Sequence, residues 1–451
     1  MKKRDSLFHD VSIRIVKLIN LVLMTTPFIF VWYRFYADQL WVKFFMRGHW
    51  LVIALFVLLY YTIGKVYEAF KISYSGIGEM VYSQMLALFE VDIIMYIIAW
   101  LLIRRAPLIT PMLGAFAVQT VVAIVWSYLS QKWYFKTFPA DRTVIIWDMR
   151  DEISPLIKRY HLEKKYRVVD TVTAQECIKN LSIIENTDTV FLVGVHSHDR
   201  NIISKYCLMN GIKAFLIPRV GDLIVASAKS VHMLHLPILK IDRNNLSYEF
   251  LIIKRLSDIL FALIGLIVSS PLMLIIAICI KAEDGGPIIF KQTRLTKGRR
   301  EFDILKFRSM KVDAEDDGLA RLSSGEEDDR ITRVGRFIRR TRLDELPNFI
   351  NIIKGDISFV GPRGERPELA EEYEREIPEF ALRLQVKAGL TGYAQVYGKY
   401  NTNPYDKLLM DLTYIANASI FEDLRILFLT IKILFMPDST EGVDPDKRTA
   451  M

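Results

Sequence analysis

Cysteine is scarce in this sequence of 451 residues, which contains only Cys177, Cys207 and Cys279. None of them belongs to a CxxC pair or a Cys/His cluster, which argues against a disulfide framework and against a structural zinc site. Internal repeats and low-complexity runs are also missing. The basic N-terminus runs into a full-length apolar stretch without a small-residue cleavage site, so we expect no cleaved secretory signal.

Hydrophobic residues are abundant, at 51% of the chain, and the mean hydropathy is +0.22. The excess lies mainly in the first 130 residues, with one further block near residues 251–280. The net charge is +8 and the pI is about 9.1, which fits contact with anionic lipid headgroups or phosphorylated substrates. Nucleic acid would explain the charge but not the apolar blocks, so we expect no nucleic-acid partner.

Four stretches near the N-terminus are long and apolar enough to cross a bilayer as helices. They cover residues 13–33, 50–66, 80–103 and 112–129. Basic residues before the first stretch and after the fourth favour cytoplasmic locations for both ends. Glu90 and Asp92 lie within the third stretch, where they could mark a conduction path. We favour contacts inside a helix bundle instead.

From about residue 140 to 245 the pattern changes to short β-rich runs that alternate with polar helical stretches. The runs are residues 143–147, 166–172, 189–195 and 212–217. They predict a small parallel, Rossmann-like α/β module. The turn after the first run, WDMRDE, lacks the glycines of a dinucleotide-binding loop, so a regulatory or structural module is favoured. We interpret His196 and His198 as surface residues rather than metal ligands.

The apolar block at residues 259–280 predicts either a fifth crossing or a helix that bends and returns to the same side. Basic residues flank the block on both sides, with Lys254 and Arg255 before it and Lys281 after it. Because basic flanking residues are typical of the cytoplasmic side, this pattern favours the second alternative. Ser270 and Pro271 lie at its middle. Proline removes a backbone hydrogen bond there, and neighbouring serine hydroxyls can occupy the freed carbonyls.

Thirteen arginines lie between Arg294 and Arg366. Many can simply form a basic membrane-facing surface, but arginine also binds phosphate through paired hydrogen bonds. Arg308, Arg339 and Arg363 are the candidates, because they neighbour tight turns or the acidic pair that follows.

That pair is Asp344 and Glu345, in the segment TRLDELP. Locally, Thr341 and Asp344 have the spacing of a helix-capping arrangement. The alternative is chemical, because a carboxylate held among arginines and a divalent cation stays ionised and can attack phosphorus. Glu345 could then ligate Mg²⁺.

The segments around this pair resemble a known family. They are KRLSDILFALIG, SSPLMLIIAICIK, KFRSM, DDRITRVGRFIRRTRLDELPNFINIIKGDISFVGPR, KAGLTGYAQVYG and DLTYI. Residues 254–437 are similar to bacterial sugar transferases of the polyprenyl-phosphate hexose-1-phosphate transferase type, and the N-terminal parts are similar to long-form members. The family's motif positions imply Asp344 as nucleophile, Glu345 as its partner and Ser270-Pro271 as a helix break. They also imply phosphate binding by Arg339 and Arg363, and Lys306 and Arg308 are our further candidates for that role.

We therefore expect a membrane protein of mixed α and α/β class. Its parts would be four transmembrane helices in residues 1–135, a Rossmann-like module in 140–245, and a mostly helical transferase domain in 250–451 with a re-entrant helix at 251–281. The resemblance implies transfer of a hexose 1-phosphate, with glucose or galactose favoured, from a UDP-sugar to undecaprenyl phosphate. It also implies Mg²⁺, with Mn²⁺ as an alternative, a covalent ping-pong mechanism, and a bacterial inner-membrane location with the transferase domain on the cytoplasmic face.

Two rival functions stay open at this point, a glycosyltransferase that releases UDP and an inactive membrane scaffold. The oligomeric state is open between monomer and homodimer. The sequence departs from the family pattern at Gly364 and Ala388, where proline is common, and in KAEDGGP. These departures can alter the loops that select the sugar.

Overall fold

The structure, a computed structural model, describes residues 2–44, 47–148, 153, 157–158, 162–242, 246–312, 330–398 and 403–434. The chain divides into two compact units, Met1–Ile217 and Pro218–Met451. The boundary precedes the end of the predicted α/β module, because residues 220–226 pack within the second unit.

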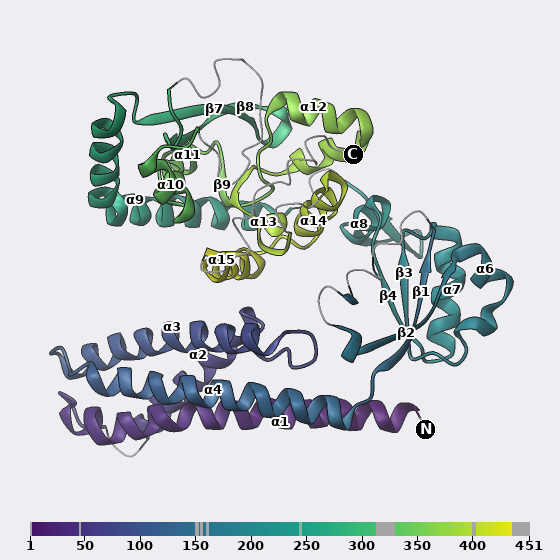
Figure 1. Cartoon of the computed structure of the whole chain (residues 1–451), viewed down its shortest axis with the longest axis horizontal. Coiled ribbons are helices and arrows are strands. Elements are labelled where there is room, and N and C mark those ends of the chain that lie inside the picture. The colour runs from purple at the N-terminus through teal and green to yellow at the C-terminus, as the bar shows by residue number, and fades with distance from the viewer. Residues whose placement is uncertain are drawn as a thin grey trace. The chain divides into compact units, whose positions relative to one another are not determined.

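The first unit begins with long apolar helices that pack against one another (Figure 1). They are α1 (Lys2–Val31), α2 (Gly48–Val66), α3 (Ile77–Ile103) and α4 (Thr110–Thr137). Each contains a segment long and apolar enough to cross a membrane, as does α9 (Tyr248–Asp284) in the second unit. These helices, which lie where apolar stretches were predicted, indicate a membrane protein.

Several polar side chains inside these four helices bind one another. Asn20 donates from Nδ2 to Gln84 Oε1 over 3.1 Å, and the Tyr60 hydroxyl donates to Asn20 Oδ1 over 2.9 Å. The Tyr67 hydroxyl donates to Glu90. Hydrogen bonds between helices are favourable in an apolar setting because the alternative is an unsatisfied polar group. Glu90 thus makes the contact inside the bundle that the sequence interpretation favoured for both acidic residues, whereas the buried carboxylate of Asp92 has no hydrogen-bond partner among the described residues.

The α/β part of the first unit is a parallel sheet in the order β2-β1-β3-β4. The strands are β1 (Asp141–Trp147), β2 (Tyr166–Thr173), β3 (Thr189–Val193) and β4 (Lys213–Leu216). Helices α6 (Ala174–Lys179) and α7 (Ser197–Met209) connect them, and apolar residues of β1, β3 and these helices form one buried core. The predicted parallel α/β module is confirmed. Most of the turn after β1, which carries the argument against dinucleotide binding, lies outside the described residues.

The second unit begins with α8 (Val220–Ala226) and the hairpin of β5 (Lys229–Met233) and β6 (Leu236–Lys240). Its further strands are β7 (Ile289–Leu295), β8 (Glu301–Phe307), β9 (Ser358–Val360) and β10 (Gly389–Thr391). Its helices after α9 are α10 (Arg333–Arg340), η6 (Leu343–Glu345), α11 (Asn348–Lys354), α12 (Pro367–Glu376), η7 (Pro378–Gln385), α13 (Tyr393–Tyr397), α14 (Pro404–Asn417) and α15 (Ile420–Leu434).

Helix α9 has two arms joined at a bend (Figure 1). Ala262 of the first arm packs against Phe302 and Ile352, whereas Ile276 of the second packs against Phe307 and Ile338. A straight helix of 37 residues would extend about 55 Å. The bend instead lets both arms pack on the second unit.

The helix break follows the chemistry of proline. Pro271 lacks the N–H that would bond the Ile267 carbonyl, and the Ser270 hydroxyl donates to that carbonyl over 2.8 Å. Ser269 likewise donates to the Gly265 carbonyl over 2.6 Å. The predicted use of serine hydroxyls at the break is confirmed.

Candidate active site

A hairpin and a short helix bring the predicted acidic pair to a lysine. Strands β7 and β8 pair antiparallel, and Gly298 in their turn has a φ of +69°, which glycine adopts without steric cost. Strand β8 presents Lys306, whose ammonium lies 2.7 Å from Glu345 Oε1 and 3.9 Å from Asp344 Oδ2. One cation thus holds both carboxylates.

The acidic pair lies directly after a left-handed residue. Arg342 has a φ of +53° and separates α10 from η6, which contains Asp344 and Glu345. Such a conformation is uncommon for a residue with a side chain, and it often accompanies functional sites. The predicted capping arrangement is wrong, because the Thr341 hydroxyl donates backwards to the Phe337 carbonyl over 2.8 Å.

Arg363 reaches the pair from a loop after β9. Strands β9 and β10 are parallel, and the Gly389 amide donates to the Pro362 carbonyl over 2.8 Å. A Cβ atom on Gly389 would lie 2.2 Å from the Gly361 nitrogen, so only glycine permits this approach. Arg363 Nη2 then lies 3.8 Å from Glu345.

A buried arginine supports that loop from behind. Arg383 donates to the Arg363 carbonyl over 2.9 Å and lies 2.6 Å from Asp411 and 3.3 Å from Glu365. Its side chain is only 3% exposed. The loop that carries Arg363 is therefore fixed by an ion-pair cluster.

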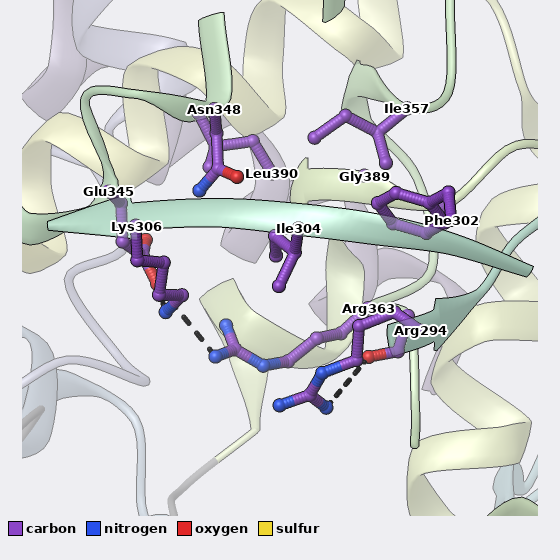
Figure 2. Close-up of a pocket in the computed structure, with 12 residues that line it drawn as sticks. Arg294, Phe302, Ile304, Lys306, Glu345, Asn348, Ile357, Arg363, Gly389 and Leu390 are labelled. Atoms are coloured by element: carbon purple, nitrogen blue, oxygen red, sulfur yellow. Dashed lines mark hydrogen bonds and ion pairs between the residues drawn. The ribbon is translucent and has the colours of Figure 1, made fainter. Parts of the chain in front are cut away.

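These elements line a small pocket. Its charged residues are Lys306, Glu345, Arg363 and Arg294, and Figure 2 shows the Arg294 and Arg363 side chains extending toward the Lys306–Glu345 pair. The other lining residues are neutral, namely Phe302, Ile304, Asn348, Ile357, Gly364, Ala388, Gly389 and Leu390. Gly364 and Ala388, where the sequence departs from the family pattern, thus both line the pocket.

The two carboxylates have different electrostatic environments. Burial raises the pKa of Asp344 above its ordinary value, although Lys306 acts in the opposite sense. Burial also acts to raise the pKa of Glu345, but the charges of Lys306, Arg363 and Arg342 outweigh it and hold that pKa well below the usual range. Glu345 is therefore the permanently ionised partner, and Asp344 is the carboxylate whose charge is less stabilised.

The other predicted phosphate-binding residues lie in different places. Arg339 on α10 is half-buried, and its charge lowers the pKa of Asp344 against the effect of burial. Arg308 is buried in an ion pair with Asp284 at the end of α9, and it does not line the pocket. Since β8 ends at Phe307, Arg308 does not continue the alternation of the strand that presents Lys306. Its position fits an anchor for the second arm of α9.

Sequence reasoning missed two pocket residues, Arg294 and Asn348. Arg294 lies on β7 among the thirteen arginines, and strand alternation alone does not separate it from the exposed ones. Burial, and then the charge of Arg363, lower the pKa of Arg294 to about 10. Asn348 is fully buried at the start of α11, where the sequence suggested only a helix start after Pro347.

Residues 249–437 match the family described as bacterial sugar transferase. The chain is 49% identical over 136 residues to a putative undecaprenyl-phosphate N-acetylgalactosaminyl 1-phosphate transferase of Bacillus subtilis, covering 30% of this chain and 75% of that protein. The chain belongs to this family.

Two longer relatives match over the same part of the chain. A UDP-N-acetylgalactosamine-undecaprenyl-phosphate N-acetylgalactosaminephosphotransferase of Aeromonas hydrophila is 40% identical, over 51% of this chain and 53% of its own. A UDP-glucose:undecaprenyl-phosphate glucose-1-phosphate transferase of Escherichia coli is 37% identical, over 48% of this chain and 47% of its own. The match to these relatives thus spans about half of their length.

Proposed function

We propose that this protein transfers a hexose 1-phosphate from a UDP-sugar to undecaprenyl phosphate and releases UMP. The observation that carries the proposal is the Asp344–Glu345 pair, held by Lys306 2.7 Å from Glu345 and by Arg363 3.8 Å from it. The names of the relatives support the same substrates. In a cell this would be an early membrane step of capsule, exopolysaccharide or O-antigen synthesis.

In the first half-reaction, an Asp344 carboxylate oxygen attacks the phosphorus that bears the sugar. The bond from that phosphorus to the bridging oxygen breaks, and its electron pair leaves with UMP. A phosphosugar-aspartate results. Lys306 and Arg363 offset charge on the phosphate oxygens, and the ionised Glu345 keeps both cations in position.

In the second half-reaction, a phosphate oxygen of undecaprenyl phosphate attacks the same phosphorus. The bond to Asp344 breaks, and the carboxylate is regenerated. UMP and the lipid phosphate are both phosphate monoesters, so one group of cations can serve both. Arg294, which lines the pocket beside Arg363, is the cation we add to this group.

We also propose Mg²⁺, with Mn²⁺ as the alternative, as the cofactor. No group of three metal-ligating side chains occurs among the described residues. Two adjacent carboxylates nevertheless meet the needs of Mg²⁺, which commonly binds one or two carboxylates together with substrate phosphates. Asp344 and Glu345 would hold the ion, which would supply positive charge to the phosphate oxygens. Chelation with EDTA should abolish turnover, and added Mg²⁺ should restore it.

We further propose that α9 is re-entrant and that the second unit lies on the cytoplasmic face of the inner membrane. Both arms of α9 pack on the same unit, while apolar residues between them, including Ile267 and Val268, are exposed. Cysteines introduced at Glu249 and Glu283 should both react with an impermeant thiol reagent only from the cytoplasmic side, in a variant without native cysteines. Labelling from opposite sides would establish a crossing helix.

The transfer reaction is tested by incubating purified protein with UDP-sugars and no lipid. Up to one UMP per site should be released, and the peptide containing Asp344 should gain one hexose-phosphate. Release of UDP would instead indicate a glycosyltransferase, and no nucleotide release with any donor would indicate an inactive scaffold. A panel that includes UDP-glucose, UDP-galactose and their N-acetylated analogues would identify the sugar.

A further inference from the structure

Asn348 is a buried amide with no protein partner in the part of the chain that the structure describes. Its exposed fraction is 0%, and neither Nδ2 nor Oδ1 makes a hydrogen bond. The residue nevertheless lines the pocket, where Figure 2 shows its amide above the strand that carries Ile304 and beside Leu390. Buried polar groups are rarely left unpaired, because each lost hydrogen bond is costly. A ligand in this pocket would supply the missing partners.

Asn351, one turn further along α11, shows what a structural asparagine looks like in the same helix. Its Nδ2 donates to the Asp303 carbonyl over 2.8 Å, and its Oδ1 accepts from the Leu305 amide over 3.0 Å. It is 2% exposed, so its burial matches that of Asn348. The two residues therefore share a helix and a similar degree of burial but differ in their hydrogen-bond partners.

The chemistry of an amide indicates which part of the substrate it contacts. A phosphate at neutral pH mainly accepts hydrogen bonds, so it would satisfy Nδ2 and repel Oδ1. A hydroxyl both donates and accepts, and it can use either atom. Lys306, Arg363 and Arg294 already supply charge for phosphates, whereas Figure 2 shows the Asn348 amide beside the apolar residue Leu390. This end of the pocket suits a neutral polyol.

The position of Asn348 favours the sugar over the uracil base. Asn348 follows Asp344 by four residues, and Glu345, one turn before it, lines the same pocket. In the proposed reaction the sugar is attached to the phosphorus that Asp344 attacks, whereas the uridine lies beyond the second phosphate. We propose that Asn348 binds a hydroxyl group of the hexose and is a specificity-determining residue; this inference rests on the proposed function.

The test compares the full-length protein with its Asn348→Leu and Asn348→Ala variants. The donors are the UDP-hexose that the wild type uses best and its monodeoxy analogues. Wild-type kcat/KM should fall about 10- to 100-fold when the contacted hydroxyl is removed. With the parent sugar, kcat/KM of the Asn348→Leu variant should fall by a similar factor. In this variant, kcat/KM for the parent donor and for that deoxy donor should differ by about twofold or less. Loss of discrimination at one hydroxyl position supports the assignment.

Two further measurements separate this role from other roles. Leucine removes two unsatisfied polar atoms, so the melting temperature of Asn348→Leu in detergent should stay equal or rise. Inhibition by UMP should be unchanged, because UMP contains no hexose. A clear fall in melting temperature would make Asn348 structural, and weaker UMP inhibition would assign it to the nucleotide; either result overturns the proposal.

Asn351→Ala is the matched control. It should lower the melting temperature but keep the wild-type ratio between the parent and deoxy donors in the folded protein. Equal discrimination by the wild type and both Asn348 variants would refute the inference while leaving the transfer reaction intact. If the wild type turns over no UDP-sugar at all, the proposed function itself fails, and these two failures are therefore distinguishable.

Discussion

Two regions of the second unit each contain an arginine with little exposed surface, 3% of the side chain for Arg383 and 16% for Arg294, and their surroundings are opposite. In the cluster behind the Arg363 loop, Arg383 lies 2.6 Å from Asp411 and 3.3 Å from Glu365. In the pocket, Arg294 donates to the Gly364 carbonyl over 3.1 Å and to Gln292, but its nearest carboxylate, Glu365, is 4.0 Å away. The Nε atoms of both arginines have no hydrogen-bond partner among the described residues, so the two arginines differ in how near their carboxylates lie.

The pKa values follow this difference. Burial acts to lower the pKa of both arginines, but Asp411 and Glu365 raise that of Arg383 above its ordinary value. For Arg294 burial dominates, and the charge of Arg363 adds to it. A buried charge that is paired within the protein supports the fold. A buried cation that faces another cation is instead a candidate anion-binding group. Substitutions should therefore affect stability in the first region and substrate use in the second.

The largest effect on activity is expected at Asp344. Asp344→Asn keeps the shape of the side chain but removes the anionic nucleophile, so kcat should fall by about 10⁴-fold or more. The melting temperature should not fall, because burial already disfavours this charge. Turnover assays and thermal unfolding in detergent measure the two quantities. Near-wild-type turnover would remove Asp344 from the chemistry.

Arg383→Ala should have the largest effect on stability. It leaves Asp411 buried and uncompensated, which should lower the free energy of unfolding by about 3–5 kcal/mol. Replacing the pair by apolar residues, as in Arg383→Met with Asp411→Leu, should recover much of that loss. An additive loss in the double variant, measured by denaturant unfolding, would show that the two residues do not act as a pair.

Arg363 connects the two regions, since its carbonyl contacts Arg383 and its guanidinium faces Glu345. Arg363→Ala should cost roughly 2–4 kcal/mol of transition-state stabilisation, or about 10²- to 10³-fold in kcat. Because the side chain is 42% exposed and the carbonyl is retained, the melting temperature should change little. A large fall in stability with unchanged kcat would place Arg363 in the structural cluster.

The smallest of these effects is expected at Arg294. Arg294→Met should lower kcat/KM through a loss of about 1.5–3 kcal/mol of transition-state stabilisation, which is the scale of a lost charged hydrogen bond. It should not lower the melting temperature, because the substitution also removes repulsion by Arg363. Arg294→Lys should recover part of the activity. If Arg294→Met instead unfolds as Arg383→Ala does, the contrast between the two regions is wrong.

The sequence predicted the features that depend on neighbours along the chain. Apolar length identified the membrane helices, and alternating β-rich runs identified the parallel sheet of the first unit. The serine–proline pair correctly predicted the hydrogen bond to the Ile267 carbonyl. The contacts of Glu345 with Lys306 and Arg363 were not predicted, because these residues come from different segments of the chain. Thr341 shows the limit of local pattern, since its spacing matched a cap and its hydroxyl bonds the preceding helix instead.

What the sequence determined by itself was which residues could be buried and which could ionise. Only the tertiary structure decided which buried polar groups find partners. Arg308 and Arg294 are both arginines on or beside the β7–β8 hairpin, yet one is paired with Asp284 and the other lines the pocket. Asn348 and Asn351 share one short helix, yet only Asn351 has hydrogen-bond partners among the described residues. The reason is physical, because a hydrogen bond or ion pair requires atoms a few ångströms apart, and those atoms come from segments that only folding brings together.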